Sequence, residues 1–317
     1  MLSGHWPDRM RRVASARVTD IRHIAPAAVR DGLFLTAEFE HRVRLWSFAD
    51  RSLTAELDTI LDFGGQRLAL CGTETPIIVA GAWERHGICG YAPDGTQLWQ
   101  RKDLRQPQHI SPAAGGTLVV ACFDQRPMHV LAAGSGETVA TVRAVRRFYD
   151  SPFTDIGLGE VYGHVALIDR HDWKVQWKAQ IDGFATLSGA AAPDAFAVGG
   201  GGGFGRHGWS TSWVSCFSTA GEELWRWACP PEVNCPALAW DDAAAQWLGV
   251  LNHVNNEQPD TLVRWSADGH VIGELPLALL ADYAFLPGGR HLVTSDGAVR
   301  ETREGGVLWE LPNPDDD

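Results

Sequence analysis

The sequence contains none of the short motifs that identify common enzyme chemistries. It has no Gly-x-Ser-x-Gly elbow, no His-Glu-x-x-His, no EF-hand spacing, and no Gly-Lys pair from which a Walker loop could be built. The glycine run Gly199–Gly203 does not complete a Gly-x-Gly-x-x-Gly fingerprint, because residue 204 is phenylalanine, and we interpret it as a flexible loop. We therefore expect no catalytic residues and no cofactor, and we favour a protein that is not an enzyme.

Signals for secretion, membranes and nucleic acid are also missing. No run of 18 apolar residues is present, residues 1–12 lack the apolar stretch of a signal peptide, and no Asn-x-Ser/Thr sequon occurs. The net charge of −12 argues against the basic surface that nucleic-acid binding requires. We expect a cytoplasmic protein, monomeric on its own, that binds neither nucleic acid nor a membrane.

Cysteine is too scarce to indicate a disulfide framework. Four of the six cysteines fall inside strand-like patterns, where a buried thiol is the ordinary outcome: Cys71, Cys89, Cys122 and Cys216. The other two, Cys229 and Cys235, flank a short loop. A disulfide or a shared soft metal ion remains an alternative interpretation of that pair.

One short pattern, by contrast, occurs seven times. Its clearest copy begins at Tyr91, has the turn residue Gly95 four positions later, and the aliphatic Leu98 three positions after that. The same frame fits without a gap from residues 46, 132, 168, 217, 265 and 301. Gly or Asp at the fifth position supplies the conformation that a tight hairpin needs. Each copy therefore predicts two antiparallel strands and their turn.

The spacing of the copies predicts the fold. They follow one another at intervals of 36 to 49 residues, and a β-repeat of roughly 40–45 residues is typical of a propeller, in which each repeat is one four-stranded blade. Two more strand-like runs precede each hairpin, as Arg67–Cys71 and Pro76–Ala80 do. We predict an all-β, seven-bladed β-propeller with four antiparallel strands, A to D, in each blade.

The propeller is expected to span residues 18–311 as one domain. It lies between a polar N-terminal arm, residues 1–17, and an acidic tail, residues 312–317. Because residues 307–311 can complete the last blade, the ring needs no strand exchange, and residues 12–17 are the only candidate for one. Tryptophans at the repeat positions are expected to pack between blades: Trp46, Trp99, Trp225, Trp265 and Trp309.

Short stretches of the chain resemble known propeller repeats. Val43–Trp46 and Leu262–Trp265 are similar to the end of the third strand of a WD40 repeat. Gly163–Asp169 and Gly95–Trp99 are more similar to the quinoprotein-type repeat. The resemblance to this WD40/quinoprotein-like superfamily covers the whole propeller at the level of the fold. WD40-like modules typically bind other proteins, so the resemblance implies a scaffold or adaptor.

Two long segments between strands B and C, residues 199–212 in blade 5 and 252–260 in blade 6, are candidates for the binding surface. Neighbouring blades place such loops on the same face, where aromatic, arginine and amide side chains are typical of recognition. The alternative is a purely structural role, in which the loops only cap a wide junction between two blades. The predicted partner-binding residues are Phe204, Arg206, His207, Trp209, Asn252, His253, Asn255 and Asn256.

Histidines recur between strands B and C, or at the start of strand C, in six of the predicted blades: His41, His86, His129, His164, His207 and His253. Strand C lies two strands from the channel, roughly 10 Å from its wall, so these side chains are expected to fan apart. Zinc needs its ligands within about 2.0–2.3 Å, and we therefore predict no metal site.

The alternative function is a small-molecule enzyme or sensor with its site at the axial channel mouth. Polar residues near the ends of the innermost strands are the candidates: Asp20, His23, His109, Asp150, Asp155, Asp241 and Asp242. Carbohydrate binding is a third possibility that aromatic and asparagine residues support, although a cytoplasmic location counts against it.

Overall fold

The computed structural model describes most of the chain. The described residues are 21, 23–27, 32–37, 42–59, 67–82, 86–124, 126–143, 145–161, 164–180, 185–201, 204–205, 208–209, 212–253, 258–280 and 282–312. For residues 180, 185–187, 201, 204–205 and 208–209 only the backbone is described. The N-terminal arm and residues 313–317 of the tail lie outside this set.

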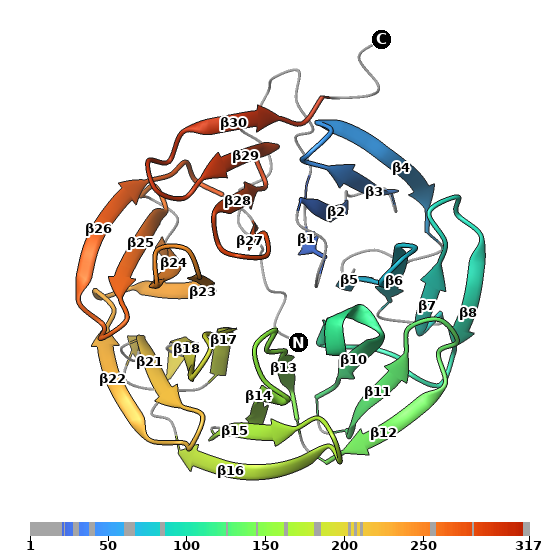
Figure 1. Cartoon of the computed structure of the whole chain (residues 1–317), viewed down its shortest axis with the longest axis horizontal. Coiled ribbons are helices and arrows are strands. Elements are labelled where there is room, and N and C mark those ends of the chain that lie inside the picture. Colours follow the sequence, from blue (N-terminus) through green and yellow to red (C-terminus); the bar gives the residue numbers. More distant parts are fainter. Residues whose placement is uncertain are drawn as a thin grey trace.

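Seven four-stranded antiparallel sheets surround a central axis, as predicted (Figure 1). Strand A of each blade lies nearest the axis and strand D forms the rim. Helix is limited, among the described residues, to the 3₁₀ turn Ala114–Gly116. None of the described helical structure is long and apolar enough to cross a membrane.

Each blade uses strands that are consecutive in order A to D, apart from an extra hairpin in blade 5. Blade 1 contains β1 (His23–Pro26), β2 (Leu33–Ala37), β3 (Arg42–Ser47) and β4 (Ser52–Asp58). Blade 2 contains β5 (Arg67–Cys71), β6 (Ile77–Gly81), β7 (Ile88–Tyr91) and β8 (Gln97–Arg101). Blade 3 contains β9 (His109–Ala113), β10 (Leu118–Cys122), β11 (Met128–Ala132) and β12 (Thr138–Val142).

The remaining four blades follow the same plan. Blade 4 contains β13 (Arg147–Tyr149), β14 (Ile156–Val161), β15 (His164–Asp169) and β16 (Lys174–Gln180). Blade 5 contains β17 (Ala185–Ala191), β18 (Ala195–Gly201), β21 (Trp213–Ser218) and β22 (Glu223–Ala228). Blade 6 contains β23 (Val233–Asp241), β24 (Gln246–His253), β25 (Thr261–Ser266) and β26 (Val271–Pro276). Blade 7 contains β27 (Tyr283–Phe285), β28 (His291–Thr294), β29 (Ala298–Glu301) and β30 (Val307–Glu310).

The innermost strands begin on one face of the ring, which we call the top face. Arg67 at the start of β5 donates from Nε to the carbonyl of Gln108, immediately before β9, over 2.9 Å. His109 at the start of β9 accepts the N–H of Phe148 in β13 on Nδ1. Because each strand A pairs antiparallel with strand B, the B–C connections share the top face. The A–B and C–D turns lie on the opposite, bottom face.

Tryptophans of the outer strands hold neighbouring blades together. Trp99 of β8 donates its indole N–H to the carbonyl of Ala133 in blade 3, over 2.8 Å. Its ring covers Gly136 in the C–D turn of that blade, where a Cβ atom would lie 2.6 Å from the ring. Trp177 of β16 covers Gly221 of blade 5 in the same way. Both glycines have positive φ, so the turn geometry and the lack of space each require glycine.

The same contact recurs between blades 5 and 6, where Trp225 of β22 donates to the carbonyl of Ala267 over 2.9 Å and covers Gly269. Trp265 of β25 packs edge-on against Trp227 across this junction, with ring centroids 5.3 Å apart. Packing between blades, as predicted for the repeat tryptophans, is therefore confirmed at these positions.

Blade 7 closes onto blade 1 by side-chain packing. Its strands β27 to β30 are consecutive in the sequence, so the described part of blade 7 contains no exchanged strand. Trp309 of β30 meets Trp46 and Phe34 of blade 1 edge to face, at centroid distances of 5.9 and 6.4 Å. Residues 12–17, the candidate for an exchanged strand, lie outside the described residues.

The glycine run of blade 5 is a correction. We predicted a flexible loop at Gly199–Gly203, but β18 extends through Gly201, and it pairs with β17 as far as Gly201 and with β21 as far as Gly200. A Cβ on Gly199 would lie 2.5 Å from the carbonyl oxygen of Cys235 in blade 6, and one on Gly200 would lie 2.5 Å from the Trp213 ring. These glycines are needed for close packing. Residues 202 and 203 lie outside the described residues.

All six cysteines are buried thiols that form no disulfide. Cys229 and Cys235 lie in the apolar core shared by blades 5 and 6. Burial raises the pKa of Cys229 to about 12, so its thiol stays protonated at neutral pH. In the structure, Cys229 and Cys235 therefore contribute to core packing and do not form a disulfide.

The Trp177–Gly221 contact predicts a difference between two turn glycines. Gly95 also has positive φ, but its nearest neighbour, the Leu57 side chain, leaves room for a Cβ at 3.7 Å. Gly95→Ala should therefore cost only backbone strain, about 1 kcal/mol. Gly221→Ala should cost about 1–3 kcal/mol more, because the added methyl group displaces the indole. Urea denaturation of both variants measures the two free energies of unfolding. An equal loss of stability in the two variants would contradict the packing of Trp177 on Gly221.

Candidate functional site

The predicted binding surface of blade 5 carries structure of its own. Its B–C connection forms an extra two-stranded hairpin, β19 (Phe204–Gly205) and β20 (Gly208–Trp209), in which Phe204 lies directly opposite Trp209. Across the described ranges, no other blade has additional strands in its B–C connection. Arg206 and His207, which connect the two strands in sequence, lie outside the described residues.

The base of this hairpin is attached to blade 6. Ser212, just before β21, donates from Oγ to the side-chain oxygen of Asn234 in β23, over 2.6 Å. Ser188 of β17 donates from Oγ to the carbonyl oxygen of Cys235, also over 2.6 Å. The two blades therefore present a joined platform beneath the hairpin.

The side chain of Asn252 in blade 6 makes its hydrogen bonds within the protein. Its Nδ2 donates to Asp260 Oδ1 over 2.8 Å and to the Tyr283 hydroxyl over 3.1 Å. Tyr283 in turn donates to Asp260 Oδ2, and Asp260 is completely buried. This network fixes the end of β24 against β27 of blade 7. His253 is the last residue of β24, while Asn255 and Asn256 lie outside the described residues.

A second cluster on the top face surrounds the start of the innermost strands of blades 2 to 4. The His109 ring packs against Tyr149 with centroids 5.2 Å apart. Burial, followed by the nearby Arg147 and Arg67 guanidinium groups, lowers the pKa of His109 to about 3. His109 is therefore neutral at pH 7, and its Nδ1 acts as an acceptor.

Acidic side chains partly balance these cations. Glu160 is 2% exposed and lies 3.7 Å from both Arg146 and Arg147. In the neighbouring blade 1, His23 Nδ1 lies 3.2 Å from an Asp282 oxygen. The top-face mouth thus contains several converging charged groups in a protein of net charge −12.

The axial residues that we predicted do not gather at one mouth. His23 and His109 begin strands A on the top face, whereas the other described members lie at the bottom face: Asp150, Asp155, Asp241 and Asp242. Asp20 lies outside the described residues. The expectation of a single mouth was wrong because nearness to the end of strand A does not specify which end.

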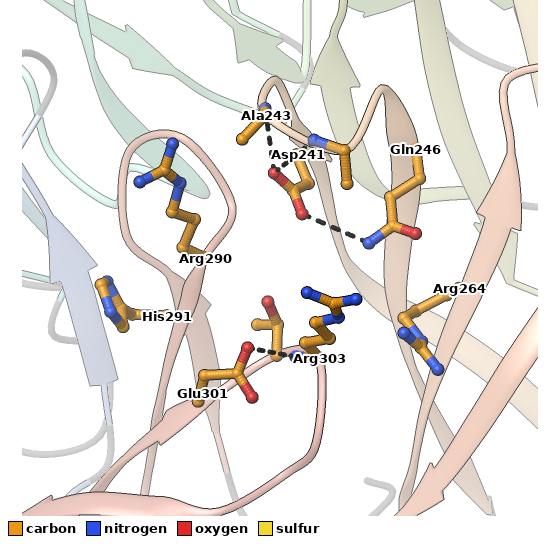
Figure 2. Close-up of a pocket in the computed structure, with 10 residues that line it drawn as sticks. Asp241, Ala243, Gln246, Arg264, Arg290, His291, Glu301 and Arg303 are labelled. Carbon is orange, nitrogen blue, oxygen red and sulfur yellow. Dashed lines mark hydrogen bonds between the residues drawn. The ribbon is translucent and has the colours of Figure 1, made fainter.

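The bottom face has a pocket of about 580 Å³ between blades 6 and 7 (Figure 2). Its charged or polar lining residues include Asp241, Gln246, Arg264, Arg290, Glu301 and Arg303. Figure 2 shows Arg303 extending from the C–D turn of blade 7 toward the turn with Asp241, and Arg264 beside Gln246.

Both carboxylates that line the pocket accept hydrogen bonds from residues of their own turns. Asp241 Oδ1 accepts the N–H groups of Ala243 and Ala244, and its Oδ2 accepts from Gln246. The carboxylate of Glu301 accepts the N–H groups of the next turn, including that of Arg303. Sequence reasoning missed this pocket, because its residues come from four separate segments of two blades and form no motif.

No protein-family model matches the sequence, and no curated protein is significantly similar to it. In the part of the chain that the structure describes, no three His, Cys, Asp or Glu side chains are arranged to hold a metal ion. Function must therefore be argued from the chemistry of these surfaces.

The position of His109 predicts a pH effect on stability. Its pKa in the folded protein lies below the value of 6.5 expected for the unfolded chain, so protonation favours unfolding. The corresponding stability is present above about pH 6.5 and is lost as the pH falls toward 3. His109→Asn keeps an acceptor near the position of Nδ1. Between pH 7 and pH 4, its melting temperature should therefore fall by less than that of wild type.

Differential scanning fluorimetry at several pH values measures this difference. His270→Asn is the matched control, because the side chain of His270 is 83% exposed. That control should follow the wild-type pH profile. If His109→Asn also follows it, the neutral buried state of His109 is wrong.

Proposed function

We propose that this propeller is a non-enzymatic interaction module that binds another protein through the top face of blades 5 and 6. The observation that carries the proposal is the hairpin β19–β20, which adds an aromatic-bearing ribbon to a rigid ring. The candidate contacts are those predicted from the sequence, with Phe204, Arg206 and Trp209 as the principal anchors. Aromatic and arginine side chains commonly dominate the energy of such interfaces.

The base of the hairpin supports this proposal. The Ser212–Asn234 and Ser188–Cys235 hydrogen bonds connect blade 5 to blade 6 directly below it. A binding segment held on a fixed platform loses less conformational entropy when a partner binds. The fold-level resemblance to WD40-like repeats supports a protein partner, and the buried free thiols agree with a cytoplasmic location.

The triple variant Phe204→Ala, Arg206→Ala, Trp209→Ala tests the proposal. It should melt close to wild type, because truncations in a loop away from packed positions usually cost little. It should lose its partner, since such anchors carry about 2 kcal/mol or more each. Affinity capture from the native host with mass spectrometry identifies the partner. Titration of wild type and of the triple variant with the purified partner then measures the loss of affinity.

The control is Asp94→Ala with Asp268→Ala, which alters C–D turns on the bottom face. This control should bind the partner as wild type does. A triple variant that melts far below wild type would show that these residues cap the core. A folded triple variant that captures the same partner would place the interface elsewhere.

A second candidate function, small-molecule sensing at the top-face mouth, is favoured by the convergence of Arg67, His109 and Arg147. Two guanidinium groups beside a neutral histidine suit an anionic ligand. Native mass spectrometry of protein purified from its host tests this function. It predicts a bound anion in wild type that is lost in Arg67→Gln, whereas a ligand-free wild type would reject it.

A further inference from the structure

We propose that the bottom-face pocket between blades 6 and 7 binds a small molecule that carries phosphate groups, through Arg264, Arg290 and Arg303. This pocket lies on the face opposite the proposed protein-binding surface, so it is independent of that function. Its lining combines residues of the A–B and C–D turns, and of the strand ends beside them, with Arg264 of β25.

The arginines of the pocket retain unused donors. Among the described residues, Arg264, Arg290 and Arg303 form no ion pair with a carboxylate, although Asp241 and Glu301 line the same pocket. Those two carboxylates accept turn N–H groups instead. Three arginines from separate segments therefore line the pocket without an internal counterion, and Figure 2 shows their guanidinium groups pointing in different directions. Their planar, two-donor geometry matches phosphate oxygens.

Arg264 provides a second, independent observation. Its Nε is buried and has no hydrogen-bond partner among the described residues. Its guanidinium lies over Gly273 of β26, where a Cβ atom would be 2.3 Å from Nη2. The missing side chain at 273 leaves room for the guanidinium. Buried donors are nearly always satisfied in proteins, so an unsatisfied one beside a pocket indicates a missing acceptor.

The two turns that carry Arg290 and Arg303 are held in fixed positions. Thr302, 2% exposed, donates from Oγ1 to the carbonyl of Gly289 over 2.9 Å and from its N–H to that of Arg290. Gly289 packs so closely on blade 6 that a Cβ would lie 2.6 Å from the carbonyl oxygen of Trp240. Fixed backbones reduce the entropy lost when a ligand binds.

The size of the pocket and its charge together define the ligand class. A volume of about 580 Å³ falls within the range of roughly 300–1,000 Å³ usual for small-molecule sites. Three arginines match an anion with more than one phosphate group. Inorganic pyrophosphate is the simplest probe of this chemistry.

Isothermal titration of the full-length protein with pyrophosphate, in phosphate-free buffer, tests the proposal. Wild type should bind one pyrophosphate per chain. Arg290→Gln with Arg303→Gln should bind at least tenfold more weakly, and should still fold because both side chains are exposed. The control, Arg105→Gln with Arg143→Gln, changes two exposed arginines outside the pocket by the same charge and should bind within about twofold of wild type.

Arg264→Met separates ligand binding from a structural role. Removing a partly buried side chain whose Nε has no partner should leave the melting temperature equal to or above that of wild type, while pyrophosphate affinity falls at least tenfold. A lower melting temperature with unchanged affinity would overturn the role of Arg264 in binding.

Three outcomes would overturn the proposal as a whole. These are no measurable binding of pyrophosphate by wild type, an equal loss of affinity in the Arg105/Arg143 control, and binding of citrate by wild type as tight as that of pyrophosphate. The first removes the site, the second reduces it to non-specific surface charge, and the third assigns it to carboxylates instead of phosphates.

Discussion

The packing of an outer-strand tryptophan onto the turn glycine of the next blade is the contact that joins blades 2 and 3, 4 and 5, and 5 and 6. Trp177 on Gly221 shows it most simply: the indole occupies the space that any Cβ would take. Where the preceding blade has Leu57 instead, the turn at Gly95 is looser. Because the described blades share no strand, contacts of this kind, together with backbone hydrogen bonds such as that from Gly72 N–H to the Gly116 carbonyl, hold neighbouring blades together.

A ring fixed in this way separates two kinds of surface. The top face carries the B–C connections, including the hairpin of blade 5 and the cations around His109. The bottom face carries the short turns, two of which bring Arg290 and Arg303 to one pocket. A protein partner and a small anion can therefore occupy opposite faces of the same scaffold.

The fold was predictable because its signals are local, whereas the sites depend on tertiary contacts. The turn residue and the aliphatic residue after it recur in sequence, and they suffice to count blades. Gly199–Gly201 was mistaken for a loop because its requirement for glycine comes from Trp213 and from Cys235 in the next blade. Likewise, no local pattern indicates that Arg264 lines one pocket together with the turns of blade 7.

A double-mutant cycle between Trp177 and Gly221 tests the inter-blade contact most directly. Trp177→Ala, Gly221→Ala and the double variant would each be unfolded in urea. If the indole lies on the turn, Gly221→Ala should cost far less in the Trp177→Ala background, where only backbone strain remains. We predict a coupling free energy of at least about 1 kcal/mol. Additive effects within about 0.3 kcal/mol would contradict the account.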